Sequence, residues 1–304
     1  MREFDFLKKI FSRNNTLGPQ ILIPPGDDLA MLRMNENTDI LMGVDQLLQG
    51  CHFPSDYDNW QNIGRKAVAR CLSDIAAMAA QPVASLATAL LPRNFDESHA
   101  EQLFESMRTC ALEYNCPLIG GDIAFSNPDS PLHLTVTVFA QPGPTNIIIK
   151  RSTGQVSDSI YITGKLGSAW QSNKHYSFIP RINLALELVN LLQDDLHAMI
   201  DISDGLGRDL DHIAESSNTA ALIHADKIPL NPDSTWQNAV SDGEDYELCF
   251  TVSAGINLPE NIHGTPITKI GNLTEPTQKY RTAVNLPDGC TMDASHMGWE
   301  HNDQ

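Results

Sequence analysis

The sequence predicts an α+β protein with two domains. Its 304 residues are enough for two domains of ordinary size. Each half mixes strand-like and helix-like patterns with acidic turns between them, and Pro142-Gly143-Pro144 breaks the chain near its middle. We therefore expect an N-terminal domain over residues 1–144 and a C-terminal domain over residues 145–304.

Hydrophobic periodicity predicts the elements of the N-terminal half. In chain order they are a helix over 1–17, strands over 30–32 and 40–42, helices over 62–80 and 98–114, and a strand over 132–138. The strand over 40–42 leads to Asp45, and Gly120-Gly121-Asp122 is expected to form a turn. On the helix over 62–80, Asp74 shares a side with small and apolar residues. An aspartate there costs stability unless it is paired or metal-bound, so Asp74 needs a partner.

The C-terminal half contains a second set of predicted elements. They are a strand over 159–163, a helix over 183–193, a helix that carries Leu206, Leu210 and Ile213, and a strand over 248–252 with alternating apolar residues. Ser203 or Asp204 is expected to cap the second helix. Gly243-Glu244-Asp245 is expected to form the turn before the last strand.

Composition limits the compartment and the partners. The formal net charge of −18 argues against sequence-independent binding of nucleic acid, which relies on Lys and Arg. Six cysteines without a CxxC pair, and a start without an apolar signal core, indicate the cytoplasm. The most apolar stretch, residues 75–91, is interrupted by Gln81 and Pro82, so no membrane role is expected.

Carboxylates beside small residues are the most informative feature of the chain. They occur in five motifs: Gly26-Asp27-Asp28, Ser73-Asp74, Gly120-Gly121-Asp122, Asp201-Ile202-Ser203-Asp204-Gly205 and Gly243-Glu244-Asp245. Small residues let the backbone and a metal approach the same ligand, and divalent cations relieve the repulsion between carboxylates and phosphates. The pattern predicts a metal-dependent, phosphate-handling enzyme.

Ordinary structural roles compete with this interpretation. The motifs at Asp27-Asp28 and Asp122 are also typical of polar turns, and helix capping explains one of the two acids in Asp201–Asp204. The acids at 244–247 also suit a solvated hairpin corner. Other catalytic motifs are missing: the sequence contains no GxxxxGK[ST] loop, GxGxxG fingerprint, HExxH pair or GxSxG elbow.

Taken in order, the motifs resemble those of the thiamine-monophosphate kinase family, whose superfamily includes aminoimidazole ribonucleotide synthetase and selenophosphate synthetase. The matching segments are Gly26-Asp27-Asp28, Asp45 with Gly50-Cys51-His52-Phe53, Lys66-Ala67 through Met78, Leu118 to Asp122, Lys150-Arg151-Ser152, Asp201 to Leu206, and Gly243 to Leu248. The ending Gly298-Trp299-Glu300-His301 also resembles the family's C-terminal aromatic motif. The match runs from near the start of the chain to its end.

The resemblance implies a fold, cofactors and site residues. It implies a homodimer whose N-terminal domains form a β-barrel, a C-terminal α/β sandwich domain, and ATP held with several Mg²⁺ ions in a cleft between the domains. The implied metal ligands are Asp28, Asp45, Asp74, Asp122, Asp201 and Asp204, of which Asp45, Asp122 and Asp204 are expected to serve catalysis. The implied nucleotide contacts are Gly121, Asp122, Arg151 and Ser203, and the implied thiamine-phosphate contacts are His52, Glu244 and Trp299. Asp27 belongs to the first motif without an assigned role.

The implied reaction suits the residues. A phosphate monoester acceptor has a second pKa of about 6 and is largely ionised at neutral pH, so no catalytic base is needed. The sequence thus favours a kinase that converts thiamine monophosphate to thiamine diphosphate by in-line transfer from ATP. Two alternatives stay open: a sister enzyme that uses ATP on another substrate, and a non-catalytic, homodimeric nucleotide-binding protein.

Several positions depart from the family pattern. Gly43-Val44 stands where Ser-Thr is usual, which removes two hydroxyls next to Asp45. Cys71 replaces an asparagine, and Ile123-Ala124-Phe125 follows Asp122 where Thr and a polar residue are usual. Ala79 and Asp242 each replace a glycine. We expect one metal site to be weakened or lost.

Overall fold

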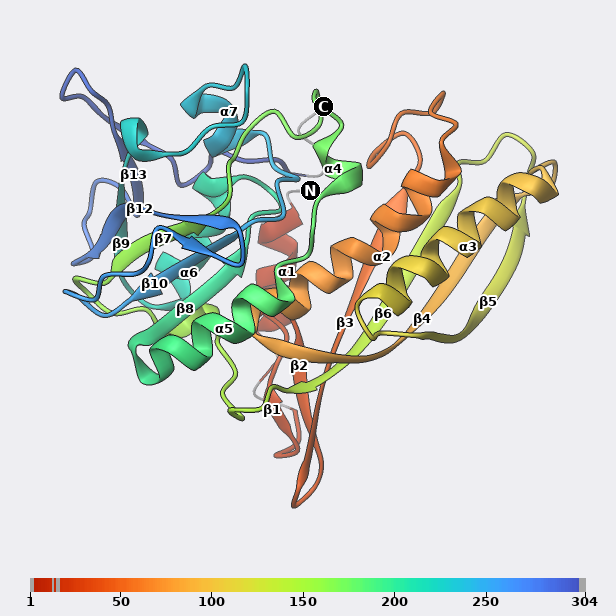
Figure 1. Cartoon of the computed structure of the whole chain (residues 1–304), viewed down its shortest axis with the longest axis horizontal. Coiled ribbons are helices and arrows are strands. Elements are labelled where there is room, and N and C mark those ends of the chain that lie inside the picture. The colour runs from red at the N-terminus through yellow and green to blue at the C-terminus, as the bar shows by residue number, and fades with distance from the viewer. Residues whose placement is uncertain (1–2, 13, 15–16, 301–304) are drawn as a thin grey trace.

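The computed structural model describes residues 3–12, 14 and 17–300 and contains two mixed layers of strand and helix (Figure 1). The elements of the first half are α1 (Glu3–Phe11), β1 (Ile21–Ile23), β2 (Ala30–Asn35), β3 (Thr38–Leu48), α2 (Trp60–Ala77), β4 (Ala80–Pro92), α3 (Glu97–Glu113), β5 (Leu118–Ser126) and β6 (His133–Pro142). Their strands form one six-stranded sheet in the order β1-β2-β3-β6-β4-β5. Within one chain this sheet is open, with β1 at one edge and β5 at the other.

The second half is built on an eight-stranded sheet. Its strands are β7 (Ser159–Thr163), β8 (Leu196–Asp201), β9 (Ala220–His224), β10 (Leu248–Val252), β12 (Thr265–Thr274), β13 (Thr282–Asn285) and β14 (Thr291–Asp293), with β11 (Asn261–Ile262) paired to β12. The helices are η2 (Arg151–Thr153), α4 (Lys174–Ser177), α5 (Ile182–Leu192), η3 (Gln193–Asp195), α6 (Leu206–Ser216), η4 (Ala225–Lys227) and α7 (Trp236–Ser241). The first sheet ends at Pro142 and the second begins at Ser159, on either side of the expected boundary.

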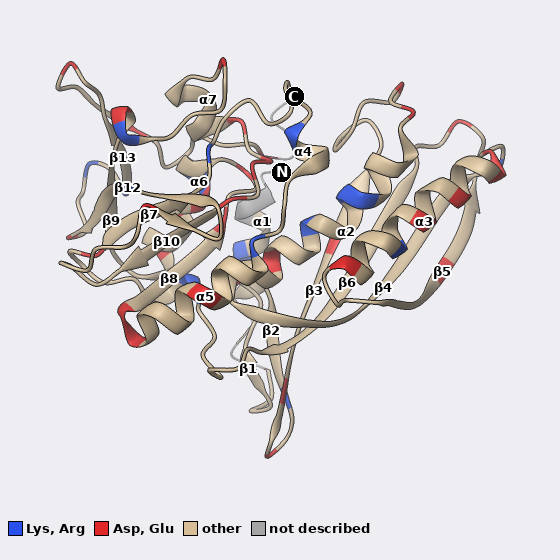
Figure 2. Ribbon diagram, in the orientation of Figure 1, with Lys and Arg blue, Asp and Glu red and all other residues tan. Residues whose placement is uncertain are grey.

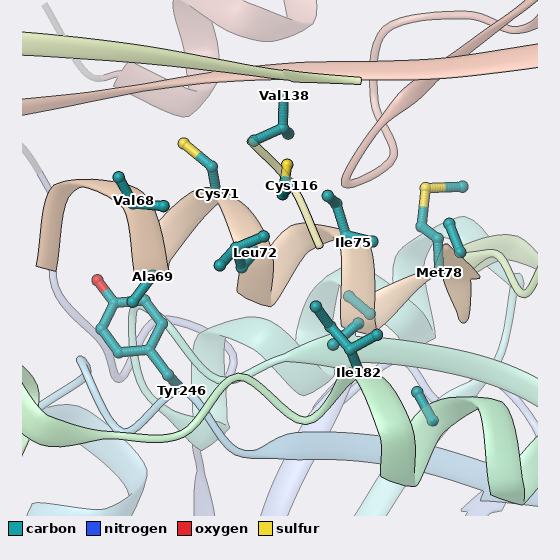
Figure 3. Close-up of a cluster of buried hydrophobic side chains, with 14 of the residues drawn as sticks. Val68, Ala69, Cys71, Leu72, Ile75, Met78, Cys116, Val138, Ile182 and Tyr246 are labelled. Atoms are coloured by element: carbon teal, nitrogen blue, oxygen red, sulfur yellow. The ribbon is translucent and has the colours of Figure 1, made fainter. Parts of the chain in front are cut away.

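Helix α2 lies at the centre of the molecule. Twelve of its residues are buried, and Figure 3 shows Leu72 and Ile75 between Val138 of β6 on one side and Ile182 of α5 on the other. The same continuous core includes Tyr246, which directly follows the acidic motif Gly243-Glu244-Asp245. Burial of α2 on both sides fixes the position and rotation of its polar residues. Those residues carry much of the site described below.

Most predicted elements are present, with ends shifted by a few residues. The turn predicted at Gly120-Gly121-Asp122 is wrong, because this segment lies inside β5. Strand β10 is confirmed with Leu248, Phe250 and Val252 on one face, and all five of its residues are buried because this face packs in one core cluster and Cys249 packs in the other. Strands β4 and β8 were not predicted. The first helix ends at Phe11, and residues 1, 2, 13, 15 and 16 of the predicted helix lie outside the described residues.

Candidate active site

Three aspartates from distant parts of the chain meet in one acidic cluster. Asp28 lies in the loop after β1, Asp74 lies on α2, and Asp201 ends β8. Carboxylate oxygens of the three lie within 4.8 Å of one another. Asp74 therefore lies beside two further acids, which repel it unless a cation intervenes.

Burial and mutual repulsion both oppose ionisation of Asp74 and Asp201 in the cluster. Burial, followed by the charges of Asp45 and Asp201, raises the pKa of Asp74 well above its ordinary value. Burial and the charge of Asp28 raise the pKa of Asp201 to about 7, although Ser73 Oγ donates a 2.5 Å hydrogen bond to its Oδ2. Oxygen ligands crowded in this way are what Mg²⁺ prefers. The donor set therefore fits the metal that the sequence implied.

Arg151 partly balances the cluster from η2. Its Nε and Nη2 donate to Asp28 Oδ2 at 3.1 Å and Oδ1 at 2.5 Å, and its backbone N–H donates to Asp27 Oδ2 at 3.3 Å. Burial and the charge of Asp28 raise the pKa of Asp27 to about 6. Asp27 thus anchors the loop to Arg151, and Asp28 remains the member of its motif that faces the cluster.

Asp45 borders the cluster from β3. Its carboxylate is among the charges that raise the pKa of Asp74 and of Asp201, and its Oδ2 lies 3.6 Å from Arg70 Nε. The two residues before it, Gly43 and Val44, offer no side-chain oxygen, and Val44 is 61% exposed. Cys71 is a core residue, since its buried Sγ lies 3.4 Å from the Val136 carbonyl oxygen.

Asp122 does not join the cluster within one chain. The register places Asp45 opposite Val136, Val136 opposite Ala87, and Ala87 opposite Gly121. Asp122 is one residue further on, three strands from β3, which is about 14 Å at 4.8 Å per strand. Because side chains alternate along a strand, its carboxylate also faces the side of the sheet opposite to that of Asp45.

Two acidic motifs of the second half are held together by their backbones. Glu244 N–H donates to the Ser203 carbonyl at 2.7 Å, and Tyr246 N–H donates to the Ile202 carbonyl at 2.8 Å. Glu244 and Tyr246 adopt left-handed φ values of 56° and 51°. The solvated-corner alternative for this segment is wrong, because Asp245 and Glu247 are 0% and 2% exposed.

Asp209 was missed by the sequence analysis and replaces the predicted cap. Helix α6 has Gly205 at its N-cap without a side-chain hydrogen bond, so capping by Ser203 or Asp204 is wrong. Instead, Asp209 Oδ2 accepts hydrogen bonds from Asp204 N–H at 3.1 Å and Gly205 N–H at 3.0 Å. An acid in the first turn of a helix was the available signal. Asp209 therefore holds the backbone of the Asp204 loop in place.

The three residues expected to contact thiamine phosphate line one cavity. This cavity has a volume of about 520 Å³, and His52, Glu244 and Trp299 share its wall with Ser203 and Asp204. The rings of His52 and Trp299 lie 6.3 Å apart, and Trp299 N–H donates to the Asp204 carbonyl at 2.8 Å. Leu48 N–H donates to His52 Nδ1 at 2.9 Å, so Nε2 carries the imidazole proton. His301, the last residue of the aromatic motif, lies outside the described residues.

A buried lysine lies beneath this cavity. Lys66, 0% exposed, donates to Glu244 Oε2 at 2.5 Å and to the His52 carbonyl at 2.7 Å, and its Nζ lies 2.6 Å from His175 Nδ1. His175 also lies 2.8 Å from Glu244, and Trp170 stacks on its ring at 4.6 Å. Lys66 thereby joins a residue of the first half to residues of the second. In the sequence, Lys66 stands out as a lysine among small and apolar helix residues, but the sequence motifs assign it no role.

The geometry combines an acidic cluster that fits metal with an aromatic and acidic cavity next to it. Arg70 connects the two, since it lines the cavity and forms an ion pair with Asp45. None of the described helices is long and apolar enough to cross a bilayer. The arrangement is chemically suited to bring a metal-bound phosphate chain to a ligand that carries rings and an anionic group.

Known proteins resemble this chain in sequence and in fold. The family model described as "AIR synthase related protein, N-terminal domain" matches residues 26–141. The thiamine-monophosphate kinases of Rhodopirellula baltica and Haemophilus influenzae are each 32% identical to the chain; the first alignment covers 92% of both proteins, and the second covers 99% of this chain and 98% of the relative. A solved structure described as "AaThiL complexed with AMPPCP and TMP" has the same fold, with a TM-score of 0.77, 24% identity, and coverage of 99% and 97%.

Proposed function

The chain belongs to the thiamine-monophosphate kinase family, and from this premise we propose how its own residues carry out the reaction. Its activity is the ATP-dependent phosphorylation of thiamine monophosphate to thiamine diphosphate. The observation that carries the proposal is the cavity shared by His52, Glu244 and Trp299 next to the acidic cluster. An aromatic wall and a carboxylate suit the aromatic, cationic rings of thiamine.

The acidic cluster holds Mg²⁺ in this proposal. Asp28, Asp74 and Asp201 are the inner ligands, and Asp45 and Asp204 border them. When bound, the metal supplies positive charge that screens the two phosphates from each other and aligns them. The raised pKa of Asp74 supports this role, because the cluster is short of positive charge without a cation.

Binding of the two substrates is divided between the halves of the chain. Glu244 and Trp299 hold the thiamine rings, and His52 lines the same cavity. Arg151 and Ser203 bind the nucleotide of their own chain, whereas Gly121, which lies on β5 next to Asp122, serves the nucleotide of the other subunit in the homodimer proposed below. The acceptor phosphate is already largely ionised at neutral pH, so these residues position it and need not remove a proton.

We also propose a homodimer in which Asp122 serves the partner's metal site. Strand β5 supports it, because this edge strand exposes Ile119, Ile123 and Phe125 by 66%, 51% and 60%. A long apolar edge strand calls for a cover, and a second copy provides one. The dimeric barrel implied by the resemblance joins two such open sheets. The distance between Asp122 and Asp45 within one chain is the reason to assign Asp122 to the partner.

All six cysteines are unpaired, which supports a cytoplasmic location.

The test is a reaction of the purified protein with ATP, Mg²⁺ and thiamine monophosphate, with thiamine diphosphate followed by chromatography. We expect product from the wild type and a loss of at least about 100-fold in Asp204→Asn, the range of a lost electrostatic group. Asp194→Asn, a change of the same kind at an exposed position of η3, should retain full activity. Circular dichroism would establish that both variants are folded.

The two alternatives predict other results in the same experiment. A sister enzyme would release ADP with another acceptor and ignore thiamine monophosphate. A non-catalytic protein would bind ATP without turnover, and the missing hydroxyls at Gly43 and Val44 are the observation that favours it. Product that disappears in Asp204→Asn excludes both.

A further inference from the structure

We propose that Arg70 binds the phosphate of thiamine monophosphate, an inference that rests on the function proposed above. The guanidinium would hold the acceptor between the ring-binding cavity and the acidic cluster. Arg70 lies on α2 within the segment from Lys66 to Met78. Four observations on α2 and the cavity support this role.

The first is the spacing of charged residues along α2. Lys66, Arg70 and Asp74 follow one another at intervals of four residues, so they lie along one face of the helix, each about 6 Å from the next at 1.5 Å per residue. Lys66 lies beneath Glu244 of the cavity, and Asp74 belongs to the cluster. Figure 2 shows the corresponding order of charge, with basic bands along α2 followed by an acidic band. Arg70 therefore lies between the cavity proposed to bind the thiamine rings and the acidic cluster proposed to bind Mg²⁺.

The second observation is the incomplete bonding of the Arg70 guanidinium. Nη1 donates to the Gln46 carbonyl at 2.9 Å, which is its only hydrogen bond to the described residues. Nε is buried and makes no hydrogen bond within the described part of the chain, and Asp45 Oδ2 at 3.6 Å is its ion-pair partner. The side chain stays 14% exposed and lines the cavity. A planar group with five N–H donors and one hydrogen bond has capacity for an anion.

The third observation is the charge of the cavity wall. Arg70 is the one Lys or Arg among the described residues that line it, whereas Asp204, Asp242 and Glu244 are all acidic. Lys66 is already bonded to Glu244 and lies out of solvent. A dianionic phosphate in this wall would meet three carboxylates without Arg70. The positive charge of Arg70 offsets the repulsion between these carboxylates and the phosphate of the acceptor at the inner end of the cavity.

The fourth observation is the poor ligand supply on the Asp45 side. Gly43 and Val44 carry no side-chain oxygen, so Asp45 has few neighbours with which to hold a cation there. Arg70 already forms an ion pair with Asp45 at 3.6 Å. The guanidinium thus supplies positive charge at the place where ligands for a metal are scarce.

The test compares binding of thiamine monophosphate and of phosphate-free thiamine to the complex with AMPPCP and Mg²⁺, by calorimetry. In Arg70→Gln we expect the affinity for thiamine monophosphate to fall about 10- to 100-fold, and that for thiamine to change less than about twofold. Arg70→Lys, which keeps the charge but not the planar fork, should fall between wild type and Arg70→Gln. Arg108→Gln removes an exposed arginine on α3 and should leave both affinities unchanged.

Equal losses for the two ligands would show that Arg70 only shapes the cavity, and no loss for either would show that it does not reach the phosphate. Either result overturns the proposal. Product formation by the wild type is measured in parallel, so failure of the kinase function is seen separately from failure of the Arg70 assignment. A melting temperature close to that of the wild type keeps a folding defect from being read as a lost contact.

Discussion

The buried Lys66 provides the most direct quantitative test of the site. In Lys66→Met a side chain of similar length but without charge replaces the ammonium group. Glu244, whose side chain is 16% exposed, then loses the donor 2.5 Å away, and the His52 carbonyl loses one at 2.7 Å. Removal of one partner of a buried ion pair typically destabilises a protein by about 3–5 kcal/mol, because the remaining charge is left without compensation.

Urea unfolding followed by circular dichroism measures this loss. We expect Lys66→Met to lower the free energy of unfolding by about 3–5 kcal/mol, and the double variant with Glu244→Gln to recover about 2 kcal/mol or more. The recovery follows because the second change removes the carboxylate that has lost its lysine partner. A loss below about 1 kcal/mol in Lys66→Met, or no recovery in the double variant, would refute the view that this pair joins the two halves.

The same pair predicts a pH dependence. Burial opposes ionisation of Glu244, but Lys66 and His175 outweigh it and lower its pKa from 4.5 to about 2. A lowered pKa means that the unfolded state binds the proton more readily, so the stabilisation is present above pH 4.5 and is lost as the pH falls towards 2. The difference in stability between wild type and Glu244→Gln should therefore shrink over that range. A difference that is constant with pH would contradict the assigned cause.

Four further changes test other parts of the structure. Gly121→Ala should lower the free energy of unfolding, measured in urea, by more than about 3 kcal/mol, because the added Cβ would lie 1.7 Å from the Ala87 carbonyl oxygen. Gly264→Ala, which has open space around its Cβ, should lower it by about 1 kcal/mol, and similar losses in the two variants would refute the close approach of β4 and β5. Asp74→Asn should raise the melting temperature in EDTA, since it relieves repulsion, and should abolish the added stabilisation by Mg²⁺; a lower melting temperature in EDTA would contradict the crowding of charge. Asp209→Ala should lower kcat and destabilise by about 1–3 kcal/mol, because two buried N–H groups lose their acceptor; unchanged kcat would show that the Asp204 loop holds itself. Phe125→Glu should convert a dimer to a monomer by light scattering, and an unchanged mass would place the interface elsewhere.

Local patterns were sufficient to locate most helices and several strands. Helix α2 was predicted over 62–80 and spans Trp60–Ala77, because its apolar face repeats at helical spacing. Strand β7 was predicted with its observed bounds, Ser159–Thr163. Strands β4 and β8 were missed because both run through apolar segments that lack a period of two. Such segments cannot be assigned from periodicity alone, since neighbouring elements decide whether they become helix or strand.

The acidic motifs show where the sequence stops being informative about the site. Each aspartate is identifiable beside its small residue, but no local pattern indicates that Asp28, Asp74 and Asp201 meet within 4.8 Å while Asp122 lies three strands away. That difference depends on strand order and register, which follow from how both sheets pack on α2. The left-handed φ of 50° at Ala79, where the family has glycine, is another property that only the surrounding structure imposes.

The sequence by itself determined the reaction class, the residue types and the order of the motifs along the chain, because acids beside small residues can be identified locally. It also determined the family, through those same motifs. Only the tertiary structure decided which acids form a cluster, that Asp209 and not Ser203 or Asp204 anchors the α6 loop, and that Lys66 and Arg70 lie between cavity and cluster. The physical reason is that these contacts join residues as many as 178 positions apart, and their geometry is set by packing between elements and not by any local propensity.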